Sequence, residues 1–388
     1  MIKSLFKIYL IKRHKPLQPS RILPKGSKVT NFNQKPTDID KTLFIQTFLN
    51  YLNKFLYFWI MKKWWVILSI CMFFSCSSPT EKIPLSFYYW RTTFALSETE
   101  KDYLTELEVD KLYVRYFDVA LKNNEPIPVT SVIFQEQTSG FEIVPVIYIK
   151  NEVFLQDTDT QDLAKKIINY IQQINTMNNI SINEIQFDCD WSLQSKDNFF
   201  QFIADVKQLH PKLSATIRLH QIKYADKTGI PDVQNGVLMY YNMGVISADD
   251  NNSIYERGIA QRYIKSLENY SLPLDIALPI FSWGVHVRDN QVVNLIGGMR
   301  QKDMATDKFK KLSAERYLVV DDFIYNGRYL AKNDVIKIEE PTTKQLKEMV
   351  KDLRKHVKNT PKEIILYDLN EQNLTEYERK VYQDIRLW

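Results

Sequence analysis

The sequence predicts an α/β fold, a (β/α)8 or TIM barrel, behind an N-terminal leader. Eight short runs rich in β-branched and aromatic residues follow one another over about 280 residues, and amphipathic helical patterns lie between most of them. The glycine-rich phosphate loops GxGxxG and GxxxxGK[ST] do not occur in the sequence, which argues against a doubly wound nucleotide-binding sheet.

The leader differs from the rest of the chain in charge. Residues 1–76 hold 13 Lys and Arg but only 2 Asp and Glu, so the remaining residues hold 38 basic and 44 acidic side chains. The net charge of +5 is therefore a property of the leader. The remainder has no basic excess of the kind that binds nucleic acid, and we expect no nucleic-acid partner.

Residues 61–76 have the pattern of a secretory signal. Met61-Lys62-Lys63 is followed by an apolar run over 64–74 and by Ser75-Cys76. This pattern resembles the lipobox of bacterial lipoproteins, which implies that Cys76 is lipidated and anchors the protein to a membrane of the cell envelope, on its periplasmic side or at the outer-membrane surface. The alternative is a membrane-spanning helix, for which eleven apolar residues are short of the usual ~20.

The predicted organisation has four parts. Because a signal peptide works only at the N-terminus, we interpret residues 1–60 as an upstream extension of the gene start or a disordered leader. Residues 61–76 are then the signal, 77–84 a tether and 85–388 the barrel. The three cysteines are Cys71, Cys76 and Cys189, so neither a disulfide framework nor a CxxC metal site is expected in the barrel, and Cys189 is expected to pack in its core.

The barrel strands are expected where apolar runs are bounded by turn or helix signals. These runs cover residues 86–91, 111–117, 143–148, 184–190, 214–220, 237–243, 276–283 and 363–368. Helices with a 3.6-residue apolar period are expected over 162–175, 198–209, 255–269 and 343–357. Between the seventh and eighth strands, Asn326-Gly327 is a type I′ turn signal between 317–325 and 328–338, and predicts a β-hairpin insertion.

The fourth strand ends in two acidic residues with alternating spacing. Asp188, Asp190 and Ser192 are expected to share one strand face, since side chains alternate with period two. Neighbouring carboxylates repel each other and lose hydration when buried. This pair therefore indicates functional carboxylates at the end of the barrel where active sites lie.

The other strands also end in aromatic and polar residues. Aromatic faces stack on sugar rings and polar groups bind hydroxyls, so this edge is predicted to be a glycan-binding cleft. The candidate ligand-contacting residues are Trp90, Arg91, Arg115, Asp118, Tyr148, Arg218, His220, Gln221, Asn242, Trp283 and Asp368.

Structural roles are the alternative for several of these residues. Asp188 could be a structural acid paired with Arg218, the tryptophans could fill the core, and His220 could be an ordinary edge residue. Neither H-x-H nor HExxH spacing occurs, and we expect no metal and no cofactor.

Three motifs resemble those of family 18 glycoside hydrolases, the chitinase-like barrels. Residues 187–192, Phe-Asp-Cys-Asp-Trp-Ser, resemble that family's fourth-strand D-x-D-x-E; residues 239–242, Met-Tyr-Tyr-Asn, resemble its sixth-strand M-x-Y-D; and residues 277–284 are similar to its seventh strand. The resemblance implies a glycan as substrate or ligand and catalytic positions at Asp188, Asp190 and Tyr241. The chain from about residue 80 to 388 also resembles uncharacterised lipoproteins of Bacteroidetes-type bacteria, which implies location and fold.

The departures from the family motif leave two classes of function open. In the family mechanism the final Glu protonates the leaving oxygen, and Ser192 in its place has no usable proton at neutral pH; Asn242 replaces a second acid. The protein is then either a hydrolase that takes its acid from elsewhere, or a non-catalytic glycan-binding or structural lipoprotein. Alternative acids are Asp118, Asp368, Asp321, Asp322 and His220.

Overall fold

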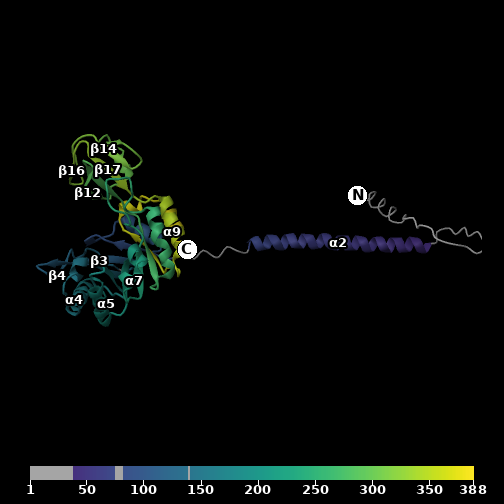
Figure 1. The fold of residues 1–388 in the computed structure, drawn as a ribbon, viewed down its shortest axis with the longest axis horizontal. Coiled ribbons are helices and arrows are strands. Elements are labelled where there is room, and N and C mark those ends of the chain that lie inside the picture. Colours follow the sequence, from purple (N-terminus) through teal and green to yellow (C-terminus); the bar gives the residue numbers. More distant parts are fainter. Residues whose placement is uncertain (1–37, 75–81, 139) are drawn as a thin grey trace, which may run out of the picture. The chain divides into compact units, whose positions relative to one another are not determined.

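The structure, a computed structural model, describes residues 38–74, 82–138 and 140–388 (Figure 1). The chain divides into two compact units, Met1–Ser78 and Pro79–Trp388. Cys76 and residues 77–81 of the expected tether lie outside the described residues. The lipid anchor therefore stays a prediction.

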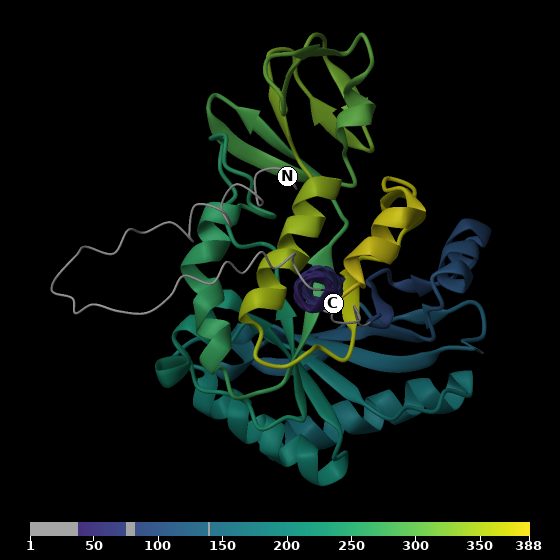
Figure 2. The same cartoon turned by 90° about the vertical axis from the view of Figure 1, so that its right-hand side faces the viewer.

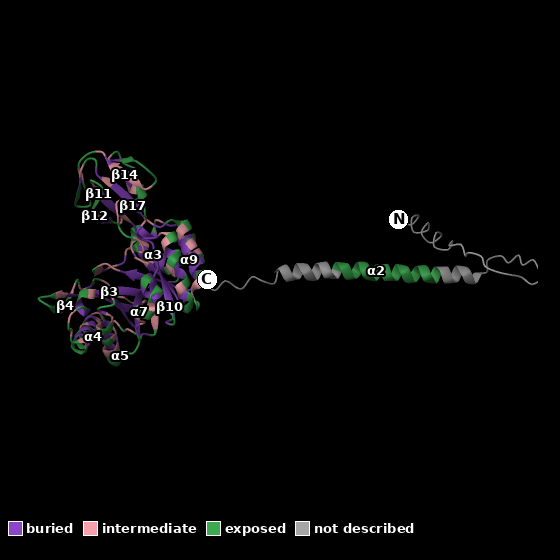
Figure 3. Cartoon of the chain, viewed as in Figure 1, coloured by how far each residue is buried: buried purple, intermediate pink, exposed green. Residues whose placement is uncertain are grey.

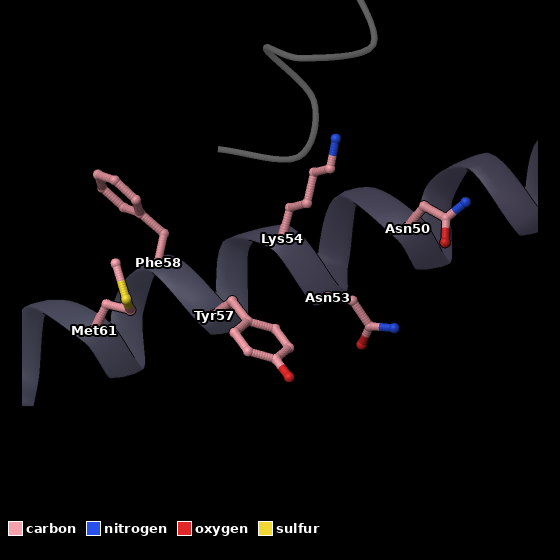
Figure 4. Close-up of a pocket in the computed structure, with 6 residues that line it drawn as sticks. All are labelled: Asn50, Asn53, Lys54, Tyr57, Phe58 and Met61. Carbon is pink, nitrogen blue, oxygen red and sulfur yellow. The ribbon is translucent and has the colours of Figure 1, made fainter.

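The described part of the first unit is one helix, α2 (Asp38–Phe74). It runs without a break through Met61, the residue interpreted as the true start. The side chains described between residues 45 and 63 are all exposed (Figure 3). Among the described helices, none combines the length and apolar character needed to cross a membrane. One face of α2 forms a shallow depression (Figure 4), lined by Asn50, Asn53, Lys54, Tyr57, Phe58 and Met61.

The second unit is built on a closed barrel of eight parallel strands, as predicted. The first strand pairs with both the second and the last, at Phe87↔Leu112 and Leu85↔Ile364, and this closes the sheet. In order around the barrel the strands are β1 (Leu85–Tyr89), β3 (Lys111–Lys122), β6 (Glu142–Ile149), β7 (Ile185–Asp188), β8 (Leu213–Arg218), β9 (Asn235–Met239), β10 (Leu274–Pro279) and β18 (Ile364–Tyr367). Each falls within or overlaps an expected run.

Helices cover the outside of the barrel, and Figure 2 shows those drawn in teal, α4 and α5, lying along the strands. Helix α4 presents Leu163, Ile167, Ile171 and Ile174 to the core at helical spacing. The helices of this unit are α3 (Glu98–Glu106), α4 (Thr160–Asn178), α5 (Lys196–Leu209), α6 (Leu219–Lys223), α7 (Ala225–Thr228), α8 (Arg257–Ile264), α9 (Thr343–His356), α10 (Glu371–Leu374) and α11 (Arg379–Ile385).

The strands bury both faces, one against the helices and one inside the barrel. Phe87 belongs to the outer core, whereas its neighbour Tyr88 belongs to the inner cluster with Tyr113 and Val146. The barrel interior is therefore packed with side chains rather than open along its length.

Buried acids occupy the amino-terminal end of the barrel. Glu363 accepts a hydrogen bond from the Tyr113 hydroxyl at 2.6 Å and lies 2.8 Å from the Lys111 ammonium. Asp275 accepts backbone N–H groups of Lys362 and Glu363 at 2.7 and 3.1 Å, and burial raises its pKa to about 7. This end of the barrel has a structural role and lies opposite the carboxyl ends of the strands.

Residues 283–339, between β10 and α9, form a five-stranded antiparallel sheet with an added hairpin, a separate lobe of this unit (Figure 1). The expected arms 317–325 and 328–338 pair with each other, and Asn326 and Gly327 both have positive φ, as a type I′ turn requires. The insertion is wider than the predicted hairpin, because three strands precede it. Its strands are β11 (Trp283–Arg288), β12 (Gln291–Gly297), β13 (Phe309–Lys311), β14 (Arg316–Val319), β15 (Phe323–Tyr325), β16 (Arg328–Leu330) and β17 (Val335–Glu339).

Candidate functional site

Strand β7 ends at Asp188, so the expectation that Asp188, Asp190 and Ser192 share one strand face was wrong. Asp188 is inside the barrel, with a side chain only 6% exposed. Its Oδ1 accepts the Thr216 hydroxyl at 2.6 Å and lies 3.3 Å from Nη2 of Arg218. These contacts match the structural alternative for Asp188.

Asp190 lies beyond the strand, with a side chain 57% exposed. Its Oδ1 is 3.8 Å from Nε2 of His220, which is itself exposed. The strand expected over 214–220 is shorter in the structure, because β8 ends at Arg218 and His220 belongs to the first turn of α6. Asp190 and His220 form a solvent-facing carboxylate–imidazole pair at the carboxyl end of the barrel.

The residues between and after the two acids are part of the core. Cys189 is buried, as expected from its sequence position, and burial raises the pKa of its thiol. The Trp191 ring stacks on Phe199 with centroids 5.1 Å apart, and its N–H donates to the Thr228 carbonyl at 2.9 Å. Trp191 therefore fixes the start of α5 rather than facing a ligand.

Ser192 forms the turn that leads into α5. Its backbone N–H donates to Oγ of Ser195 at 2.9 Å, and its carbonyl accepts the N–H of Lys196 at 3.0 Å. The two serine hydroxyls are 3.2 Å apart. Ser192 is thus a small turn residue at the start of α5.

An aromatic cluster covers the carboxyl end of the barrel interior. Tyr367 is at its centre: its ring lies 5.4 Å from that of Tyr241, nearly parallel to it, and 5.5 Å from those of Trp90 and Phe281. Trp283 extends the cluster, 5.2 Å from Phe281. Trp90, Trp283 and Tyr367 are half-buried, whereas Tyr241 is buried, which raises its pKa.

Tyr367 was missed as a site residue, although it precedes the selected Asp368. The sequence signal was present, because an aromatic residue ends this strand as in several others. Which of two consecutive residues faces the interior depends on register, and the structure assigns that face to Tyr367.

Arg115 and Asp118 bind each other rather than the carboxylates of β7. The Arg115 guanidinium donates to both carboxylate oxygens, through Nε at 2.7 Å and through Nη2, and lies 5.4 Å from the Trp90 ring centroid. Tyr148 is half-buried beside Asp188 in the ladder, and burial together with the Asp188 charge raises its pKa. The negative charge of Asp118 is therefore balanced by Arg115 of the same strand.

Two predicted ligand contacts lie toward the helices. Arg91 donates to the buried carboxylate of Glu100 at 2.8 Å. Asp368 accepts from the Asn373 amide at 2.6 Å, and burial raises its pKa to about 6. The contacts described for both residues tie them to surrounding loops and helices.

Gln221 and Asn242 also have structural contacts. Gln221 is fully buried, and its Oε1 accepts the N–H of Arg218 at 2.8 Å. Asn242 adopts a positive φ at the turn after β9, and its N–H donates to the Ile254 carbonyl at 2.9 Å. Asp321 and Asp322, the remaining acid candidates, lie in the insertion, where Asp322 accepts the N–H of Lys332.

Glu339 was not predicted, yet it contacts the site directly. It is buried on β17 and accepts the Trp283 indole N–H at 2.8 Å. The sequence carried no signal for this contact, because 56 residues separate the two and the pairing depends on the five-stranded sheet. Across the described ranges, no group of three His, Cys, Asp or Glu side chains could hold a metal ion.

Comparison with known proteins identifies a fold. Neither a family model nor a curated protein matches the sequence. A class V chitinase mutant from Nicotiana tobaccum, solved in complex with NAG4, is 9% identical with a TM-score of 0.51, over 79% of this chain and 99% of that one. The Bacillus cereus spore cortex-lytic enzyme SleL is 12% identical with a TM-score of 0.49, over 80% and 76%. Human YKL-39, described as a pseudo-chitinase with retained chitooligosaccharide binding properties, is 10% identical with a TM-score of 0.44, over 78% and 98%. The second unit of this chain therefore has a TIM-barrel fold, which it shares with the class V chitinase.

Proposed function

We propose that the barrel binds a glycan at the carboxyl ends of its strands. The observation that carries this proposal is the aromatic cluster, in which Trp90, Trp283 and Tyr367 are half-buried around a packed interior. A half-buried aromatic ring offers apolar surface without losing all contact with water, as a sugar-binding surface requires. Asp190 and His220 add exposed hydrogen-bonding groups at the same end of the barrel.

The fold and this chemistry support one class of ligand. The similar chitinase was solved with NAG4, and we propose an N-acetylglucosamine-containing oligosaccharide as the ligand of this chain. Two of the predicted catalytic positions, Asp188 and Tyr241, are buried, and Asp188 is engaged with Thr216 and Arg218. In this proposal they shape the floor of the site.

Binding without hydrolysis is the form of the proposal that the fourth strand favours. A glycosidase needs a proton donor at the glycosidic oxygen, and Ser192 is a turn residue without a titratable proton. Asp118 is ion-paired with Arg115, and Asp368 is bound by Asn373. These alternative acids are thus held by other groups.

Hydrolysis with a different donor is the second candidate, favoured by one observation. Asp190 and His220 are both exposed and 3.8 Å apart, so a protonated imidazole could serve as acid beside the carboxylate. Release of reducing sugar that depends on both residues would support it.

We further propose that Cys76 carries a lipid and anchors the barrel to the bacterial cell envelope, in a lipoprotein family of Bacteroidetes-type bacteria. The sequence 73–78, Phe-Phe-Ser-Cys-Ser-Ser, supports this. Expression of wild type and Cys76→Ala in a bacterial host with a radiolabelled fatty acid tests it. Label on wild type alone is expected, and equal labelling would contradict the anchor.

The glycan proposal is tested by titration calorimetry of the full chain with N-acetylglucosamine oligomers of two to six units. Affinity is expected to increase with length as more rings stack on the cluster. Incubation of the same samples for days, followed by chromatography of the sugars, separates binding from hydrolysis. An absence of binding across the oligomers and across peptidoglycan fragments would contradict the proposal.

A further inference from the structure

We propose that Glu339 and Lys337 of the insertion are positioning residues that hold Trp283 and the loop 242–254 in one fixed arrangement for the glycan. This inference rests on the proposed function and deepens it. It makes the insertion part of the binding site and assigns the indole of Trp283 to a pyranose ring.

Glu339 joins the ends of two barrel strands through a single oxygen. Its Oε2 accepts the Trp283 indole N–H at 2.8 Å and the Ser253 backbone N–H at 3.1 Å, and also binds the Ser253 hydroxyl. Trp283 follows the seventh strand of the barrel, whereas Ser253 belongs to the loop after the sixth. The position of one is therefore coupled to that of the other.

Lys337 fixes the remainder of that loop. Its Nζ is 2.7 Å from Oε1 of Glu339. Arg316, opposite Lys337 in the neighbouring strand β14, donates to the carbonyl of Ala248 at 2.7 Å. Lys337 itself donates at 2.8–2.9 Å to three backbone carbonyl oxygens, those of Ser247, Asp249 and Asn251.

The loop is also closed at its base. Asn242 N–H donates to the Ile254 carbonyl at 2.9 Å, and Gly244 N–H donates to the Ser253 carbonyl at 3.1 Å. A Cβ on Gly244 would lie 3.0 Å from Cα of Ser253, so the close approach of the two segments favours glycine. Val245 and Ile246, which follow this base, are exposed.

The energetics of the ion pair favour a role in orientation over one in stability. Glu339 and Lys337 are 0% and 1% exposed. Burying two charges removes the hydration of both ions, and well-packed apolar replacements of such pairs are often as stable. Unlike an apolar pair, the ion pair orients its neighbours, because its oxygens and ammonium bind defined atoms of Trp283 and the loop.

The contact with Glu339 restricts which part of the Trp283 side chain a ligand can contact. Its N–H edge is occupied by Glu339, and one neighbour of its ring is Phe281 at 5.2 Å. The surface left to a ligand is ring carbon, which suits the C–H face of a sugar. A preset ring binds with a smaller entropy loss than one that must be ordered on binding.

Two readouts on the full chain test this role. In protein labelled with 15N-tryptophan, Trp283→Phe identifies the indole N–H resonance of Trp283, and Glu339→Leu is expected to shift it. The same variant is expected to raise the Kd for tetra-N-acetylchitotetraose about tenfold. Glu339→Gln keeps an oxygen acceptor and is expected to restore most of the affinity, with a smaller displacement of the resonance.

Asp334→Asn is the matched control. Asp334 is another buried carboxylate of the insertion, but it binds His286 and Arg288 rather than the site. It is expected to lower stability without moving the Trp283 resonance or the Kd. If Glu339→Leu does not fold, the Trp283 indole resonance in Glu339→Gln tests the role of Glu339 instead. It is expected to move, because an amide oxygen is a weaker acceptor than a carboxylate.

An unmoved resonance, or an equal rise of Kd in Asp334→Asn, would overturn the role of Glu339. Failure of the wild type to bind the tetramer would instead contradict the proposed function, since the resonance is measured without sugar. The two failures are therefore distinguishable.

Discussion

Asp188 and Asp190 are two residues apart, yet the first has a side chain 6% exposed and the second 57%. The difference arises because β7 ends at Asp188 and the chain then turns out of the barrel. One acid is consequently bound by Arg218 inside, and the other faces solvent beside His220. The two acids of one motif are thus expected to behave differently when changed.

Asp188→Asn is expected to destabilise the fold, whereas Asp190→Asn is not. The first change leaves Arg218 without its anion, at a cost of about 3 kcal/mol in the free energy of unfolding. The second alters an exposed side chain and is expected to change that free energy by less than about 0.5 kcal/mol, while weakening glycan binding. Urea denaturation measures both, and equal losses for the two variants would contradict the assignment.

Trp90→Ala is expected to weaken binding of the tetramer about tenfold, because a stacking ring contributes of the order of 1 kcal/mol or slightly more. The matched control is Trp191→Phe. Trp191 is buried against Phe199, so its replacement should lower stability and leave the affinity unchanged. Calorimetric titration of both variants makes the comparison, and a larger affinity loss in Trp191→Phe would exclude the cluster as the binding surface.

The strands of the barrel were predictable because each buries both faces and therefore appears as an apolar run, as in 276–279 or 364–366. The positions of the side chains at the carboxyl ends of the strands were less predictable. His220 and Asp190 lie just past strand ends, where one residue of difference changes the direction of a side chain. Glu339 was out of reach for another reason: its contact with Trp283 depends on how the insertion folds.

Stability is expected to fall as pH rises from about 4 to 7 through Asp275. Burial raises its pKa from 3.8 to about 7, so the folded chain holds a proton that the unfolded chain releases. This contribution is fully present below pH 4 and is lost as pH passes 7, with a slope of at most roughly 1.4 kcal/mol per pH unit. Asp275→Asn is expected to flatten the slope in urea denaturation across this range, and an unchanged slope would count against the raised pKa.

Gly327→Ala is expected to destabilise the insertion by about 1 kcal/mol. Gly327 has φ +75°, and no atom lies within 4 Å of an added Cβ, so the effect isolates backbone strain. Gly297→Ala is the matched control, since it also has free space but no positive φ, and should cost little. Thermal unfolding compares the two, and equal shifts in Tm would contradict the type I′ turn.

The pairing of Leu85 with Ile364 has a consequence for biosynthesis. On the ribosome β1 is synthesised first of the eight barrel strands and its partner β18 last. Until then β1 and β10 are both without that neighbour, and such strand edges promote association between chains. Closure of the barrel therefore waits for the last of its strands, over a very long sequence separation, and the unfinished sheet is the species that chaperones would have to protect.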